Sequence, residues 1–271
     1  MEGKMTVLSI LGCKILQDEL VWLLSNDSDI DNILIVENEN IYEFTEKLDE
    51  QHIHYEILPL DKISNKLEDT DENKVTIVVN FLEVALHMLL DKLKSEVYQN
   101  MREMITFSSG ILLFYGLCGN VLGDVEKDFS MESDGCVIRI LKDNTGRVVD
   151  DCIAATVGGY ANYFKLITES TKEPAFFLTP MFATSWKEFP LTGYDFDSNP
   201  EEALRLWKMV NDIAGYSRVA KVNTGLTYVE DFDEKVEEYA KLFGYSIFEI
   251  SGNQEIFENC YQSIKNELGI I

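Results

Sequence analysis

Short apolar runs that alternate with helical stripes constrain this chain more than any other feature. Runs that are apolar on both faces, each followed by a helical pattern, lie at Thr6–Leu11, Val75–Val79, Ile111–Leu117 and Arg218–Val222. Strands buried on both faces are typical of parallel sheets, whose crossover connections carry helices. The sequence therefore predicts an α/β fold with a mostly parallel sheet or sheets and helices on both faces, with two Rossmann-like lobes as one arrangement.

The length of the chain allows one large domain or two smaller ones. It has 271 residues, of which 46% are hydrophobic, and no linker rich in Pro, Gly or Ser divides it. If there are two lobes, we expect an N-terminal lobe over residues 1–107 and a C-terminal lobe over residues 108–271; the alternative is a single domain. A long helix is predicted over Phe81–Met104, with His87 packed in the core.

The connection Met181–Pro200 is long, irregular and aromatic in pattern and includes Trp186 and Tyr194. A connection of this length is either a lid over a site or a packing element between domains. The pattern does not decide between these two roles.

The charge of the chain excludes one class of partner. Its 48 acidic and 23 basic residues give a net charge of −25, which repels a phosphate backbone, so we expect no nucleic-acid partner. No apolar run approaches the roughly 20 residues of a membrane span, and the N-terminus lacks the pattern of a signal peptide. We therefore expect a cytoplasmic protein that does not insert into a membrane.

Three of the five cysteines recur at equivalent places. Cys13 follows the first buried strand, Cys118 follows the run that ends at Leu117, and Cys152 opens a helix behind Asp151. In a parallel sheet, all strand-to-helix turns lie along one edge, where ligands bind. We therefore expect these three thiols to lie close together.

Thiols in such positions suggest metal chemistry. A helix N-terminus favours the thiolate, and three thiolates can hold an iron–sulfur cluster with one open iron, a zinc ion with an open position, or the cobalt or nickel of a larger cofactor. The spacing does not distinguish these, and only three histidines are available to a different kind of site. The alternative is that the cysteines only pack as small apolar residues, as we expect for Cys136 and Cys260.

Further candidates for cofactor binding lie beside these turns. Gly119 and Asn120 follow Cys118, and Asp151 precedes Cys152. Thr224 and Gly225 follow a strand and could present backbone amides to an anionic group. No Walker A, G-x-G-x-x-G, C-x-x-C, H-E-x-x-H or G-x-S-x-G motif is present, so the sequence assigns no catalytic residue.

Several of these motifs together resemble a known family. They are Leu11-Gly-Cys13, Asp18-Glu19-Leu20, Tyr115-Gly-Leu-Cys-Gly119, Asp151-Cys-Ile153 with Gly158 and Tyr163, Phe177-Leu-Thr-Pro180, and Trp186. In this order the chain resembles the domain of unknown function 1638 family over most of its length. Members commonly have glycine after the Thr-Pro pair with tryptophan next to it, whereas this chain has Met181 and a later Trp186.

The resemblance implies a setting more than a reaction, since the family is frequent in methanogens and other strict anaerobes, often beside corrinoid-dependent methyl transfer. The leading hypothesis is a thiolate metal- or iron–sulfur-binding protein of anaerobic one-carbon metabolism, as a methyltransferase or a cofactor-accessory protein. Zinc, an iron–sulfur cluster or a corrinoid would be its cofactor, and a corrinoid protein or methyltransferase its partner. The alternative is a metal-free module that binds a small molecule or a corrinoid protein. Whether the chain is an enzyme stays open.

Overall fold

The computed structural model describes residues 6–71, 73–84, 86, 89–169, 173–189, 196 and 199–271. Among these residues, the strands are β1 Thr6–Cys13, β2 Asn32–Val36, β3 Glu56–Leu58, β4 Val75–Leu82, β5 Gly110–Phe114, β6 Val137–Ile140, β7 Ala175–Leu178, β8 Arg218–Asn223 and β9 Ser246–Ser251. The helices are η1 Lys14–Leu16, α1 Gln17–Ser25, α2 Tyr42–Glu50, α3 Leu60–Glu68, α4 Leu90–Ile105, α5 Val125–Asp128, α6 Cys152–Thr156, α7 Tyr160–Glu169, α8 Pro180–Ser185, η3 Trp186–Glu188, α9 Pro200–Ile213, α10 Phe232–Phe243 and α11 Glu255–Glu267.

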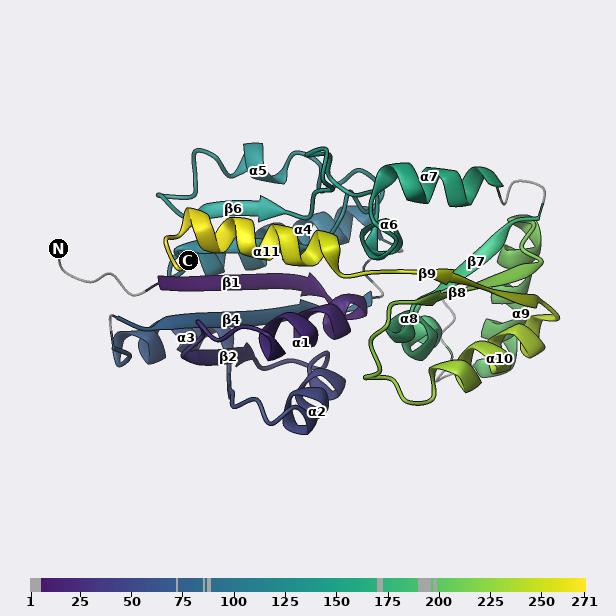
Figure 1. Ribbon diagram of the computed structural model, residues 1–271, viewed down its shortest axis with the longest axis horizontal. Coiled ribbons are helices and arrows are strands. Elements are labelled where there is room, and N and C mark those ends of the chain that lie inside the picture. The colour runs from purple at the N-terminus through teal and green to yellow at the C-terminus, as the bar shows by residue number, and fades with distance from the viewer. Residues whose placement is uncertain are drawn as a thin grey trace.

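The strands form two parallel sheets that lie at opposite ends of the molecule (Figure 1). The larger sheet has the order β3-β2-β4-β1-β5-β6, and the smaller has the order β7-β8-β9. Every pairing between these strands is parallel. The prediction of a mostly parallel α/β fold is confirmed.

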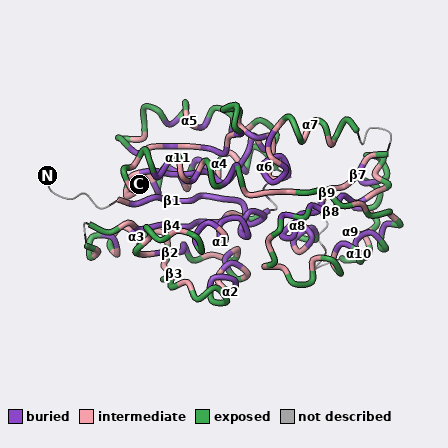
Figure 2. The backbone as a smooth tube through the Cα atoms, in the orientation of Figure 1, coloured by how far each residue is buried: buried purple, intermediate pink, exposed green. Residues whose placement is uncertain are grey.

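Helices cover both faces of the larger sheet because its central strands are apolar on both sides. Ile77 and Val79 of β4 share a core with side chains of α1, α2 and α11. Val78, between them, packs with α3 on the opposite face, where Ile111 and Leu113 of β5 pack with α4 and α5. Figure 2 shows β1 and β4 buried along nearly their whole length, as expected for the centre of a sheet covered on both faces.

The last helix returns to the larger sheet. After β9 the chain crosses back, and α11 packs against β5, β6 and α1 (Figure 1). The boundary predicted between residues 107 and 108 falls between α4 and β5, and β5 pairs with β1 in the same sheet. The larger unit is therefore built from residues on both sides of that boundary and from the C-terminal helix.

The predicted helix over Phe81–Met104 is wrong in its first part. Strand β4 continues through Phe81 and Leu82, which pair with Gly12 and Cys13 of β1, and the helix begins only at Leu90. The apolar side chains after the β-branched run favour either state, and the long neighbouring strand β1 provides the partner that extends β4. His87 lies outside the described residues.

The first part of the connection after β7, through Glu188, is helical, whereas its pattern predicts an irregular segment. Thr179 caps α8 by accepting a hydrogen bond from the Phe182 amide at 3.3 Å, and Pro180 occupies the first helical position. The turn η3 then places Trp186 in the interior, at 6% exposure. Tyr194 lies outside the described residues.

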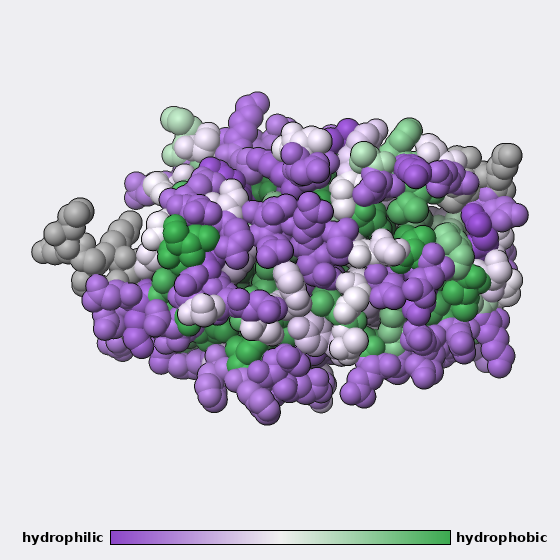
Figure 3. Space-filling model, viewed as in Figure 1, coloured by the Kyte–Doolittle hydropathy of each residue, from purple (hydrophilic) through white to green (hydrophobic). Residues whose placement is uncertain are grey.

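The surface is largely hydrophilic, as Figure 3 shows for one face. This agrees with the net charge of −25. No helix in the described part of the chain is both long and apolar enough to cross a membrane.

Candidate functional site

The three singled-out cysteines lie at or beyond the carboxyl ends of three neighbouring strands of the larger sheet, β1, β5 and β6. Cys13 is the last residue of β1, Cys118 lies in the turn after β5, and Cys152 is the first residue of α6. Cys13 and Cys118 belong to one buried apolar cluster, and Cys152 packs against it. The expectation that these residues belong to one edge of the sheet agrees with this arrangement.

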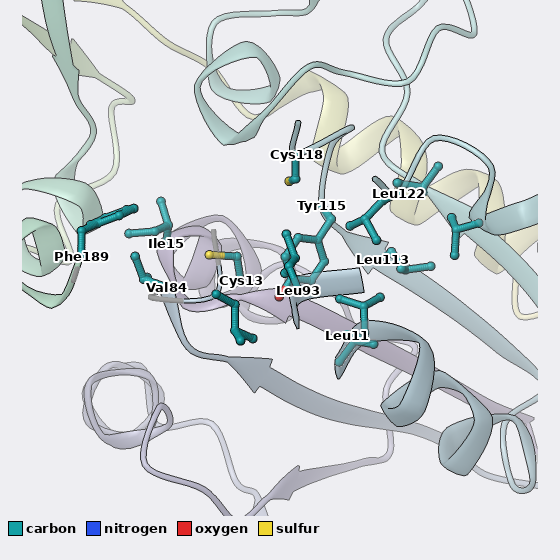
Figure 4. Close-up of a cluster of buried hydrophobic side chains, with 14 of the residues drawn as sticks. Leu11, Cys13, Ile15, Val84, Leu93, Leu113, Tyr115, Cys118, Leu122 and Phe189 are labelled. Carbon is teal, nitrogen blue, oxygen red and sulfur yellow. The ribbon is translucent and has the colours of Figure 1, made fainter. Parts of the chain in front are cut away.

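Tyr115 lies between these elements, and its ring is beside Cys13 and Cys118 (Figure 4). Burial raises the pKa of Tyr115 well above its usual value, and the proximity of Cys13 and Cys118 raises it further. Burial likewise raises the pKa of Cys152, with additional contributions from Asp151, Cys13 and Cys118. The three thiols and Tyr115 therefore form one electrostatically coupled group, which we call the thiol cluster.

Burial opposes the anionic form of two thiols of this cluster, Cys13 and Cys152. Burial raises the pKa of Cys13 to about 12, and Cys152 is also shifted upward although it opens a helix. Helix α6 has only five residues, and its cap is the carboxyl group of Asp151, which raises the pKa of Cys152 further. At Cys13 and Cys152, desolvation therefore opposes the thiolate form that a helix N-terminus favours.

Cys118 departs from the prediction in its backbone. It does not open a helix but lies in a tight turn with φ of 44°, followed by Gly119 at 72° and Asn120 at 67°. A Cβ atom on Gly119 would lie 2.7 Å from a methyl group of Leu90, so glycine is needed there for space as well as conformation. Gly119 and Asn120, both predicted to bind a cofactor, thus shape the turn that holds Cys118.

Asp151, a third predicted cofactor ligand, is engaged in holding its own helix. Its carboxylate accepts a hydrogen bond from the Ala154 amide at 2.8 Å and another from the Tyr163 hydroxyl at 2.9 Å. Burial nevertheless raises the pKa of this carboxyl. Asp151 therefore orients the first turn of α6 and with it Cys152.

The two remaining candidates lie in the smaller sheet. Thr224 is buried after β8, where its hydroxyl accepts from the Leu226 amide at 3.2 Å and its carbonyl accepts from Gln254 at 2.7 Å. The Gly225 amide donates to the Asn223 side chain at 3.0 Å. These hydrogen bonds fix the loop after β8 and connect it to Gln254, directly before α11.

The donor set of the thiol cluster suits a soft metal, but its geometry is not that of a formed metal site. Within the described ranges, no group of three or more His, Cys, Asp or Glu side chains is placed to hold a metal ion. The other two thiols do not lie at these turns. Cys136 is buried in the same apolar cluster, but it directly precedes β6 and so lies at the opposite, amino-terminal edge of the sheet. Cys260 on α11 exchanges hydrogen bonds with the backbone of Lys142. A metal would require the three thiols to move and to lose protons.

Sequence reasoning missed the buried charges at the start of α1. Asp18 and Glu19 are each 2% exposed, and Asp18 pairs with Lys47 of α2 at 2.7 Å. The Lys47 ammonium also lies 2.8 Å from the sulfur of Met181 on α8, which joins this group to the smaller unit. The available signal was a pair of adjacent acids near the start of the predicted helix, five and six residues after Cys13.

Glu19 connects these charges to the thiol cluster. It contributes to the raised pKa of Cys152, and one of its carboxyl oxygens has no hydrogen-bond partner in the described part of the chain. Burial and the neighbouring Asp18 carboxylate raise the pKa of Glu19 from 4.5 to about 8. Glu19 is therefore mostly a neutral acid at pH 7.

We expect the raised pKa of Glu19 to make the stability of the protein depend on pH. The unfolded chain ionises Glu19 near pH 4.5 and the folded chain only near pH 8, so this group should reduce stability as the pH rises through that window. Glu19→Gln should remove this loss, so its stability relative to wild type should increase with pH. Urea unfolding at several pH values checks this, with exposed Glu103→Gln as control; parallel profiles for all three proteins would contradict it.

Fold and site together define the class of this protein: an α/β protein of two parallel sheets, with a buried thiol cluster at the carboxyl edge of the larger one. The chain belongs to the family described as Protein of unknown function (DUF1638), whose model matches residues 81–261. The match includes Cys118 and Cys152, whereas Cys13 lies before it. No curated protein matches the chain significantly.

Proposed function

We propose that Cys13, Cys118 and Cys152 bind a soft metal ion or an iron–sulfur cluster, and that the protein serves anaerobic one-carbon metabolism linked to corrinoids. Its role there would be that of a methyltransferase or a cofactor-accessory protein. One observation carries the metal-binding proposal: three thiols from separate connections share one buried, coupled neighbourhood at the ligand-binding edge of a parallel sheet. The metabolic setting rests on the family resemblance.

The chemistry of the donors supports this proposal. Thiolates are the preferred protein ligands of zinc and of iron–sulfur clusters, and they bind only after deprotonation. Because burial raises the pKa of Cys13 and Cys152, the metal must displace their protons, and occupancy should increase with pH. Tyr115, Glu19 and Asp151 would surround such a centre and shield it from water.

A metal-free binding module is the second candidate. It is favoured by the geometry of the described side chains, none of which form a ready three-ligand group. In this reading the partner is a small molecule or a corrinoid protein. Trp186 would not be its contact, because the indole is buried at 6% exposure.

Purification without oxygen, followed by metal analysis and an absorption spectrum, tests the proposal. We expect wild type to contain metal or cluster, and Cys13→Ala, Cys118→Ala and Cys152→Ala each to lose most of it. Cys136→Ala and Cys260→Ala are matched controls that should retain it, and thermal unfolding verifies that every variant is folded. A colourless, metal-free wild type that takes up no zinc or iron would favour the binding module, and equal occupancy in all five variants would disprove the site.

A further inference from the structure

We infer that the protein has a second ligand site, which binds a small organic cation of the amine class. The site is a cavity of about 490 Å³ at the carboxyl ends of β2 and β4. Its volume is within the range of pockets that hold small metabolites. None of the five cysteines lines it, so the cavity is distinct from the thiol cluster, although Leu82 of its lining pairs with Cys13 in the sheet.

The topology of the larger sheet explains why a cavity opens there. Strands β2 and β4 are neighbours, but the chain leaves them toward opposite faces: α2 shares the core of one face and α4 that of the other. Diverging connections leave a crevice outside the strand ends, and such crevices are where open α/β sheets bind ligands. Val36 at the end of β2 and Leu82 at the end of β4 both line the cavity.

A row of asparagine side chains provides its polar groups. Asn80, which is 1% exposed, accepts a hydrogen bond from Asn38 at 3.2 Å and donates one to Asn100 of α4 at 2.9 Å. Asn100 in turn donates to the carbonyl of Glu96 at 2.9 Å. The row joins three segments and fixes each amide in orientation, yet a carboxamide has two donor hydrogens and two acceptor sites. Capacity therefore remains for a ligand in the cavity that all three amides line.

The charges of the cavity select the class of ligand. Four carboxylates line it against one ammonium, and that ammonium, of Lys92, already lies 3.7 Å from Glu83. The others are Glu37, Glu39 and Glu96. Phosphate or carboxylate ligands would be repelled, whereas a protonated amine would be attracted and could donate to amide and carboxylate oxygens. The partly exposed side chain of Leu82 offers apolar contact to its carbon chain.

Calorimetric titration with three matched probes tests this inference at constant ionic strength. Putrescine carries two ammonium groups, butanediol has the same carbon chain without charge, and succinate is its dicarboxylate counterpart. We expect saturable binding of one putrescine per chain, binding of the diol weaker by at least about tenfold, and no binding of succinate. Absence of putrescine binding, or equal binding of diol and diamine, would overturn the inference.

Variants distinguish binding of putrescine in the cavity from its nonspecific attraction to an acidic protein. Glu96→Gln and Asn80→Leu should each weaken putrescine binding by about tenfold or more. Glu103→Gln removes the same charge from an exposed position on the same helix and should leave binding unchanged. If the Glu103 and Glu96 variants lose affinity equally, putrescine binds only as a counterion and the site does not exist. Cys118→Ala should still bind putrescine, which makes this test independent of the proposed metal centre.

Discussion

Replacing Lys265 with methionine is expected to lower the free energy of unfolding by about 3–5 kcal/mol, because the change leaves a buried carboxylate without its cation. The Lys265 ammonium on α11 lies 2.7 Å from both carboxylate oxygens of Asp27 and 2.9 Å from Asp29. The side chains of Lys265 and Asp27 are only 2% and 3% exposed. Urea unfolding at neutral pH measures the loss.

An exposed ion pair is the matched control for this change. Lys208 and Asp212 lie 3.0 Å apart on the surface of α9 with half-exposed side chains, so Lys208→Met should cost no more than about 0.5 kcal/mol. Adding Asp27→Leu to Lys265→Met should restore part of the lost stability, since an apolar pair no longer buries a lone charge. Equal, small effects at both sites would show that the buried pair contributes little.

The ion pair between Lys265 and Asp27 also predicts that the protein loses stability in acid. Burial alone would raise the pKa of Asp27, but hydrogen bonds from Lys265 and Tyr261 outweigh it and hold this pKa below its usual value of 3.8. A lowered folded pKa adds stability above the unfolded pKa, and that stability is lost as the pH falls through the folded one. The free energy of unfolding of Lys265→Met should therefore depend less on pH than that of wild type below about pH 4.

Replacing Trp186 with alanine should also cost about 3–5 kcal/mol, because the ring fills the interior of an aromatic cluster. Its centroid lies 5.0 Å from Tyr239 and 5.8 Å from both Trp207 and Phe243, so η3 is packed against α9 and α10. Thermal and urea unfolding measure the effect. We expect the smaller unit to lose the fixed position of the connection after β7.

Met131→Ala is the control, since Met131 is 93% exposed and should tolerate truncation with little change in stability. The comparison also tests the two roles considered for the aromatic connection. If Trp186→Ala keeps the stability of wild type, the indole is not a packing element, and a role as a lid gains support. A large loss of stability supports packing.

The sequence predicts the fold class because parallel strands are apolar on both faces, as Val75–Val79 shows. It does not predict where β4 ends, because Phe81 and Leu82 become a strand only through pairing with β1. The alternation of strands and helices predicts the edge of the sheet on which Cys13 lies. It does not predict the charge state of the Cys13 thiol, because desolvation depends on side chains from distant segments.

The contacts of the buried polar groups could not be predicted from the sequence either. Asn80 appears in the sequence only as a polar residue at the end of an apolar strand. Its partners Asn38 and Asn100 come from two other connections, so the amide row exists only once strand order is known. The Lys265 pair with Asp27 joins residues more than 200 positions apart, and no local pattern marks it. Alternation predicts the sheet, whereas tertiary contacts determine the chemistry at its edge.

The return of α11 to the larger sheet affects how the chain can fold during synthesis. Phe257 of α11 packs on Phe114 of β5 with ring centroids 5.7 Å apart, so it covers a sheet whose last strand ends at Ile140. Helix α11 begins at Glu255, and at roughly 5–20 residues per second the ribosome needs several seconds or more to make the intervening chain. During that interval the smaller sheet is made while the part of the larger sheet at β5 and β6 lacks the helix that covers it. A nascent chain of this protein should therefore be a substrate for chaperones until its final residues emerge.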